Sequence, residues 1–250
     1  MREIHPGASN AVDVLGVYAA DERSPHDDGL PWLVLGMVAT ADGATTLDGG
    51  SGALGGEADR TVFAAIRAVP DVILVAAATV RAEGYGPPRP AETVRSAREA
   101  RGQAPAPRLA VITASLDLDP SARLFAEAEP ENRPFVITAA GGEPERLASL
   151  AAVAEEVIVV GTGRVELRAA LAQLAARGSR IVLCEGGPSL NGQLIAADLV
   201  DELCLTVPPM LASGESARVA HGPAPPAPTG LRLARVLEHQ GALCLRYVRA

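Results

Sequence analysis

The segment IVLCEGGPSLN, residues 181–191, passes from a strand pattern into the start of a helix. Its first four residues are apolar and do not alternate with polar residues, which indicates a strand buried on both faces. Gly186 and Gly187 permit a tight turn, and Pro188 suits the first helical turn because its missing N–H needs no partner there. A strand that leads directly into a helix indicates an α/β fold with a mainly parallel sheet.

The same alternation extends outward from this segment along the chain. Helix-like stretches separate the apolar runs, so we expect helices to flank a mainly parallel central sheet. The last two runs, residues 231–237 and 242–248, predict an antiparallel C-terminal hairpin that closes the sheet. The other strands are expected at residues 32–40, 72–76, 108–113, 134–138, 157–160, 180–184 and 203–207, and the helices at residues 57–69, 143–154, 165–177 and 188–197.

Two proline-rich stretches, residues 86–107 and 214–230, are expected to be long loops. Neither separates two hydrophobic cores, so we predict one domain over residues 31–250. Residues 1–30 are expected to form an N-terminal appendage with a short helix near residues 12–20.

The chain shows no targeting signal and no run of roughly 18 apolar residues, so we expect a cytoplasmic protein that does not enter a membrane.

The composition excludes several classes of reaction and argues against one class of partner. The 250 residues are 48% hydrophobic and carry a formal net charge of −8, which argues against non-specific binding of nucleic acid. All basic residues are arginines, because the chain contains no lysine. Reactions that need a lysine amine, such as Schiff-base or P-loop chemistry, are therefore excluded. The three cysteines lie in apolar runs and are predicted to be buried thiols, and the four scattered histidines predict no metal site.

The glycine turn of the opening segment has two interpretations. N–H groups at a helix start attract an anion, and the missing Cβ atoms of Gly186 and Gly187 let a pyrophosphate approach, so residues 186–190 form a candidate phosphate cradle. Alternatively, the glycines only turn a strand into a helix. After another expected strand, Gly161 and Gly163 match the first two glycines of the dinucleotide-binding pattern G-x-G-x-x-G. Glu166 occupies the position of the third glycine, so we interpret residues 161–163 as a loop.

Two further segments carry polar groups after expected strands. Asp42-Gly43 is an ordinary turn signal, whereas the glycine-dense loop at residues 49–56 is typical of a mobile loop that closes over a ligand. The helix after it delivers Arg67 either to a substrate anion or to its own C-terminal dipole. Thr79 and Glu83 follow the next expected strand, either as ligand contacts at the sheet end or as a helix cap and a solvent-exposed acid.

In their order and spacing, five short motifs resemble the reductase domain of riboflavin biosynthesis, the C-terminal half of the bifunctional deaminase-reductases. The motifs are Thr40-Ala41-Asp42-Gly43, Ile66-Arg67-Ala68, Thr79-Val80 with Glu83, Glu185-Gly186-Gly187, and Leu199-Val200-Asp201-Glu202-Leu203. The resemblance spans residues 33–248 and implies a dihydrofolate-reductase-like fold. It also implies a homodimer that transfers a hydride from NADPH to C1′ of the ribosyl group of a 5-amino-6-(5-phosphoribosylamino)uracil.

The resemblance assigns roles to individual residues. It implies NADPH contacts at Ala39, Ala53, Thr79, Glu83, Gly186, Gly187, Pro188, Ser189 and Leu190, the last four within a turn of residues 187–193. It implies substrate contacts at Ser51, Arg67, Glu185 and, through a looser match, Arg89. Glu185 and Glu83 are the predicted catalytic carboxylates, each as a proton source or as a hydrogen-bond partner of the pyrimidine.

The sequence departs from the family pattern in two ways. It has no deaminase motif of the His-x-Glu and Pro-Cys-x-x-Cys kind, and Glu83 stands where the family has aspartate. We therefore expect a stand-alone NADPH-dependent reductase of a pyrimidine. A pteridine or dihydrofolate reductase of the same fold and a non-catalytic NADP(H)-binding module are the alternatives.

Overall fold

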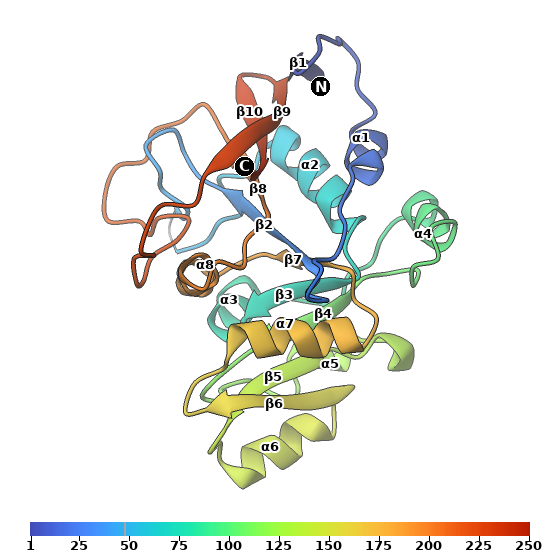
Figure 1. Ribbon diagram of the computed structural model, residues 1–250, viewed down its shortest axis with the longest axis vertical. Helices are drawn as coiled ribbons and strands as arrows, with labels where there is room; N and C mark the ends of the chain where they lie inside the picture. Colours follow the sequence, from blue (N-terminus) through green and yellow to red (C-terminus); the bar gives the residue numbers. More distant parts are fainter. Residues whose placement is uncertain (48) are drawn as a thin grey trace. The chain divides into compact units, whose positions relative to one another are not determined.

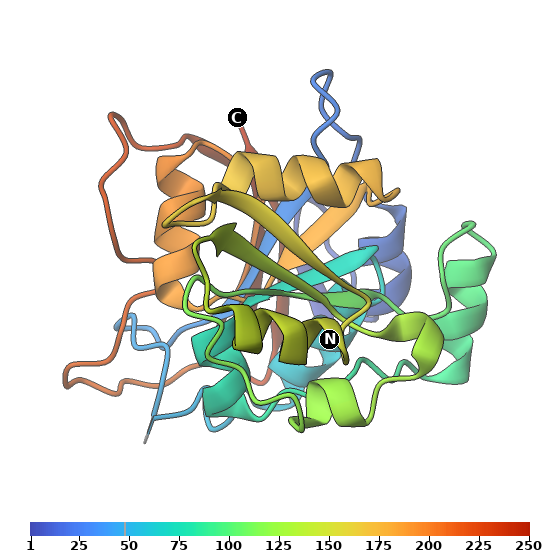
Figure 2. The ribbon, with the colours of Figure 1, turned by 90° about the horizontal axis from the view of Figure 1, so that it is seen from below.

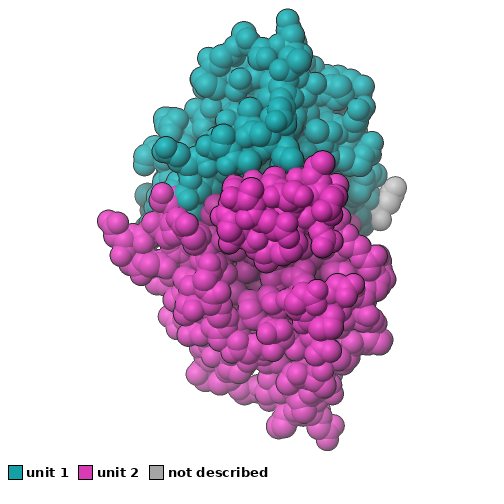
Figure 3. Space-filling view, turned by 90° about the vertical axis from the view of Figure 1, so that its right-hand side faces the viewer, with its two compact units in different colours: residues 1–23, 32–69, 183–250 teal, residues 24–31, 70–182 magenta. Residues whose placement is uncertain are grey.

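Strand β7 (Ile181–Cys184) and helix α8 (Pro188–Ala196) follow each other in a computed structural model of the protein, as the opening segment predicts. The structure describes residues 1–47 and 49–250. Contacts within the chain divide it into two compact units, which Figure 3 colours teal and magenta. Unit 1 comprises residues 1–23, 32–69 and 183–250, and unit 2 comprises residues 24–31 and 70–182. The expected division into residues 1–30 and 31–250 stays a prediction.

Unit 1 contains the strand order β1-β9-β10-β8-β2. Strands β2 and β8 are parallel, whereas β8, β10, β9 and β1 are antiparallel neighbours (Figure 1). Gln240 and Gly241 both have positive φ and form the two-residue turn between β9 and β10, so the predicted hairpin is confirmed. The elements are β1 (Arg2–His5), α1 (Val14–Ala20), β2 (Trp32–Val38), α2 (Glu57–Arg67), α8, β8 (Glu202–Val207), β9 (Leu231–His239) and β10 (Ala242–Arg249).

Unit 2 is built on four parallel strands in the order β3-β4-β5-β6. Parallel strands need cover on both faces, and helices α6 and α7 lie on opposite faces of the β5–β6 pair (Figure 2). The α/β class with a mainly parallel sheet is thereby confirmed. The elements are β3 (Val72–Ala76), α3 (Ala77–Glu83), α4 (Glu92–Glu99), β4 (Arg108–Ile112), α5 (Arg123–Ala126), the 3₁₀ turn η1 (Pro130–Asn132), β5 (Phe135–Ala140), α6 (Pro144–Ala151), β6 (Glu156–Thr162) and α7 (Leu167–Ala176).

The expected loop at residues 86–107 is wrong, because it contains helix α4. Arg98 of this helix is fully buried, and its guanidinium donates to the carbonyl oxygens of Pro70 and Ala104, each at 2.8 Å. Prolines and charges in the sequence suggest a solvated loop. The carbonyl groups that receive the arginine become adjacent only after folding.

The other differences are at element ends and in short elements. Strand β1 and helix α5 were not predicted, and β6 runs to Thr162 through part of the expected loop at residues 161–163. The short helix expected near residues 12–20 is confirmed as α1, whose N-cap Asp13 accepts the N–H of Gly16 at 3.1 Å. All three cysteines are free and buried, as predicted. Across residues 1–47 and 49–250, no helix is both long and apolar enough to cross a bilayer.

Candidate functional site

Glu185 directly follows β7 and forms a bidentate pair with Arg67. Its Oε1 accepts the Nε–H of Arg67 at 2.7 Å, and its Oε2 accepts the Nη2–H at 2.6 Å. The carboxylate side chain is 2% exposed, whereas the arginine side chain is 32% exposed. Two parallel hydrogen bonds between planar groups fix both side chains in orientation as well as in distance. The end of β7 therefore presents a nearly buried carboxylate backed by a cation that reaches the surface.

Helix α2 delivers Arg67 to this pair. Glu57 and Asp59 lie in its first turn and Arg67 in its last, the arrangement that the helix dipole favours. The guanidinium also lies over the ring of Phe63, 4.4 Å from the centroid. Arg67 thus has the dipole-complementing position of the second interpretation, and its contact with a substrate anion stays a prediction.

The residues after Glu185 form the start of helix α8. Gly186 has φ +88°, a conformation that favours glycine, and Gly187 is the N-cap without a side chain to cap the helix. Pro188 occupies the first turn, so Ser189 and Leu190 supply the backbone N–H groups that face the helix entrance. A helix end of this kind carries about half a positive elementary charge and suits a phosphate group. The helix start predicted from the sequence is confirmed, and its role as a cradle stays a prediction.

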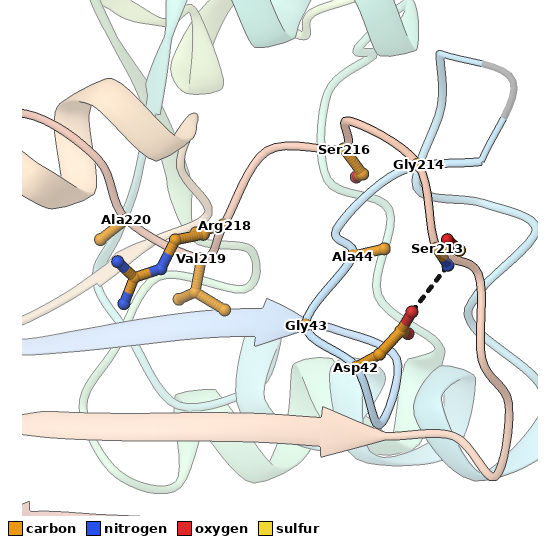
Figure 4. Close-up of a pocket in the computed structure, with 9 residues that line it drawn as sticks. All are labelled: Asp42, Gly43, Ala44, Ser213, Gly214, Ser216, Arg218, Val219 and Ala220. Atoms are coloured by element: carbon orange, nitrogen blue, oxygen red, sulfur yellow. Dashed lines mark hydrogen bonds between the residues drawn. The ribbon is translucent and has the colours of Figure 1, made fainter.

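Asp42, in the turn after β2, connects two distant segments of unit 1. Its carboxylate accepts the hydroxyl of Thr40 and the backbone N–H groups of Ala212 and Ser213, the last at 2.6 Å (Figure 4). These hydrogen bonds, led by the one from Thr40, lower the pKa of Asp42 to about 2. Nearby, the Ser216 hydroxyl oxygen accepts the N–H groups of Thr45 and Thr46, each at 3.1 Å.

A cavity of about 440 Å³ lies beside Asp42 (Figure 4). Its walls are residues 42–44 and six residues of the segment 213–220. The volume lies within the range of small-molecule sites. Sequence reasoning gave no site role to Asp42 or Ser216, since Asp-Gly is a common turn signal and the backbone N–H groups from Ser213 to Asp42 and from Thr45 to Ser216 each come from a residue 171 positions away in the chain.

The remaining predicted site residues of unit 1 lie near the ends of strands or in the glycine-rich loop. Ala39 is buried after β2 and donates its N–H to the Thr206 carbonyl at 3.0 Å. Ser51 is half-buried and accepts the N–H of Leu54 through its carbonyl at 3.0 Å, and Ala53 is exposed. Their ligand contacts stay predictions.

Unit 2 contains the other predicted residues. Thr79 and Glu83 lie on helix α3, and Glu83 is exposed. Ala76 is the N-cap of this helix, so the alternative that Thr79 caps it is wrong. Arg89 pairs with Glu127 at 3.0 Å, with its side chain 69% exposed. A role of Arg89 in binding a substrate phosphate requires that this exposed pair exchange partners, which costs little at the surface.

Residues 1–47 and 49–250 contain no group of three or more His, Cys, Asp or Glu side chains placed to hold a metal ion.

Comparison with known proteins gives relatives over most of the chain. A protein named 2,5-diamino-6-ribosylamino-4(3H)-pyrimidinone 5′-phosphate reductase, from Methanothermobacter thermautotrophicus, is 31% identical over 188 residues, which cover 75% of this chain and 82% of that one. A protein of the same name from Aquifex aeolicus is 31% identical over 192 residues, covering 74% and 80%.

The fold has solved counterparts. The crystal structure of a pyrimidine reductase-like protein from Corynebacterium diphtheriae aligns with a TM-score of 0.80 at 30% identity and covers 88% of this chain and 92% of that one. The family model described as the RibD C-terminal domain matches residues 31–245. The chain belongs to the RibD C-terminal domain family, which confirms the family that its ordered motifs resemble.

Proposed function

We propose that this protein is an NADPH-dependent reductase of a ribosylaminopyrimidine 5′-phosphate, of the 5-amino-6-(5-phosphoribosylamino)uracil type. The observation that carries the proposal is the Arg67–Glu185 pair, which stands one residue before the glycine turn into α8. At the end of β7, a carboxylate that can bind the pyrimidine is thus followed directly by a helix start that can bind a phosphate. The names of the relatives from Methanothermobacter and Aquifex support the same substrate class.

The start of α8 fits the cofactor. Gly186 has the positive φ that lets the turn bring its backbone close to a ligand, and no side chain caps the N–H groups of Ser189 and Leu190. These groups, with Gly187 and Pro188, would hold the cofactor phosphates, and Ala39, Ala53, Thr79 and Glu83 are the further proposed contacts. When bound, NADPH supplies the hydride that reduces ribosyl C1′.

The protein's own residues orient the substrate. Glu185 already accepts two hydrogen bonds from Arg67, so we assign it the role of an acceptor that receives N–H groups of the pyrimidine. Arg67 prevents this carboxylate from rotating, and with Ser51 it lines the proposed substrate side. Glu83 is the second acidic residue, and we assign its carboxylic acid form, protonated from solvent, as the donor of the proton to the ring oxygen that departs when the sugar opens.

The test is oxidation of NADPH by the purified protein with a panel of substrates. The panel contains the diaminopyrimidinone ribosyl phosphate, its deaminated uracil counterpart and dihydrofolate. Turnover of either phosphate supports the proposal, and turnover of dihydrofolate alone supports a pteridine reductase. Binding of NADPH without turnover of any compound indicates a non-catalytic binding module, and absence of NADPH binding contradicts all three.

Two further properties belong to the proposal. The resemblance to the reductase domain leads us to propose a homodimer that acts in the cytoplasm. Analytical ultracentrifugation at several protein concentrations measures the first property. A single species with the mass of one chain at all concentrations contradicts it.

A further inference from the structure

Asn191 is a fully buried amide immediately after the residues of the proposed cradle. Its Nδ2 donates to the carbonyl of Val219 at 2.8 Å and contacts the sulfur of Met37 at 3.2 Å. Its Oδ1 accepts the thiol of Cys184 at 3.5 Å. One side chain in α8 thus contacts the end of β7, strand β2 and the segment that follows β8.

The state of Cys184 agrees with this arrangement. Burial raises the pKa of its thiol to about 12, so the sulfur keeps its proton and donates it to the amide oxygen. The amide nitrogen then necessarily points at the Val219 carbonyl. Partners at both its oxygen and its nitrogen therefore set the orientation of the Asn191 amide. An apolar side chain of similar shape would leave the Val219 carbonyl without this donor.

Backbone contacts reinforce the same junction. The N–H of His221 donates to the carbonyl of Pro188 at 3.1 Å. A Cβ atom on Gly192 would lie 2.1 Å from the carbonyl oxygen of His221, so the helix backbone rests directly on this segment and only glycine fits. The first turn of α8 is therefore held by contacts with the segment 219–221 and, through Asn191, by contacts with strands β2 and β7.

We propose that Asn191 is a positioning residue for the cofactor phosphates. It holds the first turn of α8 so that the N–H groups of Ser189 and Leu190 converge on one point, and it does not itself touch the ligand. A preformed array of donors binds an anion more tightly than donors that must be ordered on binding. This inference rests on the proposed function, because it takes the start of α8 as the phosphate site.

The test compares two substitutions in the same helix. Asn191→Leu keeps the number and branching of the side-chain heavy atoms and removes both polar atoms at the first turn. Leu194→Ala, at a fully buried position one turn further along, perturbs the packing of the same helix without changing its entrance. For each variant we measure the NADPH dissociation constant by fluorescence, the melting temperature, and kcat and KM for the pyrimidine substrate.

Asn191→Leu is expected to weaken NADPH binding about tenfold or more, with kcat at saturating NADPH and KM for the pyrimidine within about threefold of wild type. Leu194→Ala is expected to lower the melting temperature and leave the NADPH dissociation constant within about twofold. Asn191→Ser, which keeps one hydroxyl donor, is the milder variant if Asn191→Leu does not fold. It is expected to weaken NADPH binding by an intermediate factor.

Equal NADPH affinity in the Asn191 variants and in wild type overturns the positioning role and leaves the proposed function intact. Equal loss of affinity in the Asn191 and Leu194 variants also overturns it, because the residue is then only a packing element. A wild-type protein that binds no NADPH contradicts the proposed function itself.

Discussion

Unit 1 contains two arginine–glutamate clusters that use the same chemistry in different surroundings. Glu202, at the start of β8, is completely buried and accepts hydrogen bonds from Arg23, from Arg246 and from the indole N–H of Trp32. Glu185, at the end of β7, accepts two hydrogen bonds from Arg67, whose side chain is 32% exposed. The arginine partners of the first carboxylate are buried, whereas the arginine partner of the second reaches the surface.

The difference in partners separates a structural ion cluster from a site. Burial acts to raise the pKa of Glu202, but the attraction of Arg23 and the hydrogen bonds from Arg246 and Arg23 outweigh it and lower the pKa to about 2. Asp21 extends the cluster to Arg235 at 2.7 Å. The cluster fastens residues 21–23 to strands β8, β9 and β10. Glu185 instead pairs with a residue that reaches solvent, where a substrate can add its own donors.

The largest expected effect is the loss of the Glu202 carboxylate. Glu202→Ala leaves two buried guanidinium groups without their shared anion, and we expect a loss of about 3–5 kcal/mol in the free energy of unfolding, measured with denaturant. Glu92→Ala, which removes an exposed partner of Arg95, is the control and is expected to change little. Equal losses in the two variants would remove the distinction between the buried cluster and an ordinary surface pair.

Lowering the pH should also show that Glu202 contributes to stability through its ion pairs. The pKa of Glu202 lies below its ordinary 4.5 in the folded protein, so the stability it contributes is present above pH 4.5 and is lost as the pH falls toward 2. We expect this loss to reach about 3 kcal/mol, measured as the denaturant midpoint against pH. The Glu202→Gln variant, already destabilised, should lose less of its remaining stability over this range. A variant curve parallel to the wild-type curve contradicts the assignment.

Substitution at the other pair should affect turnover more than stability. Glu185→Gln keeps the shape and removes the charge, and we expect turnover of the pyrimidine to fall by about 100-fold while the NADPH dissociation constant stays unchanged. Glu156→Gln breaks a bidentate pair with Arg177 in unit 2 and is the matched control. Wild-type turnover in Glu185→Gln removes this residue from the mechanism.

The smallest effect concerns the cysteine beside each carboxylate. Burial raises the pKa of Cys184, which precedes Glu185, to about 12, and it raises that of Cys204, 3.4 Å from Glu202, well above its ordinary value. Neither thiol should react with iodoacetamide in the folded protein near neutral pH. At low denaturant we expect Cys184 to be labelled before Cys204, as followed by mass spectrometry, because a ligand site opens more easily than a buried ion cluster. Simultaneous labelling contradicts that order.

Local patterns in the sequence were sufficient for most of the elements. The run at residues 181–184 with Gly186, Gly187 and Pro188 predicts a strand, a turn and a helix start because each step depends only on neighbouring residues. The same approach failed at α4, where Arg98 is buried against carbonyl groups that the sequence does not place nearby. It also failed at β1, a four-residue strand whose partner β9 lies more than 200 positions away.

Part of the candidate site could likewise be predicted from the sequence, and part could not. Glu185, Arg67 and the glycine turn were singled out from the sequence because they stand in recognisable motifs. For Asn191 the resemblance implied only a direct NADPH contact, as part of the turn at residues 187–193, and no positioning role was predicted, since its partners Met37 and Val219 come from distant parts of the chain. The sequence marked which residues carry chemistry near the turn, and the contacts between segments show what holds them in place.

By itself, the sequence determined the alternation of strands and helices, the C-terminal hairpin, the absence of lysine chemistry and the family. Each of these follows from residue type and local order. Only the tertiary structure decided that Arg67 meets Glu185, that Glu202 lies between Arg23 and Arg246, and that Asn191 anchors the start of α8. The physical reason is that a charge or an amide acquires its role from its burial and its partners, and both are set by residues brought together from distant parts of the chain.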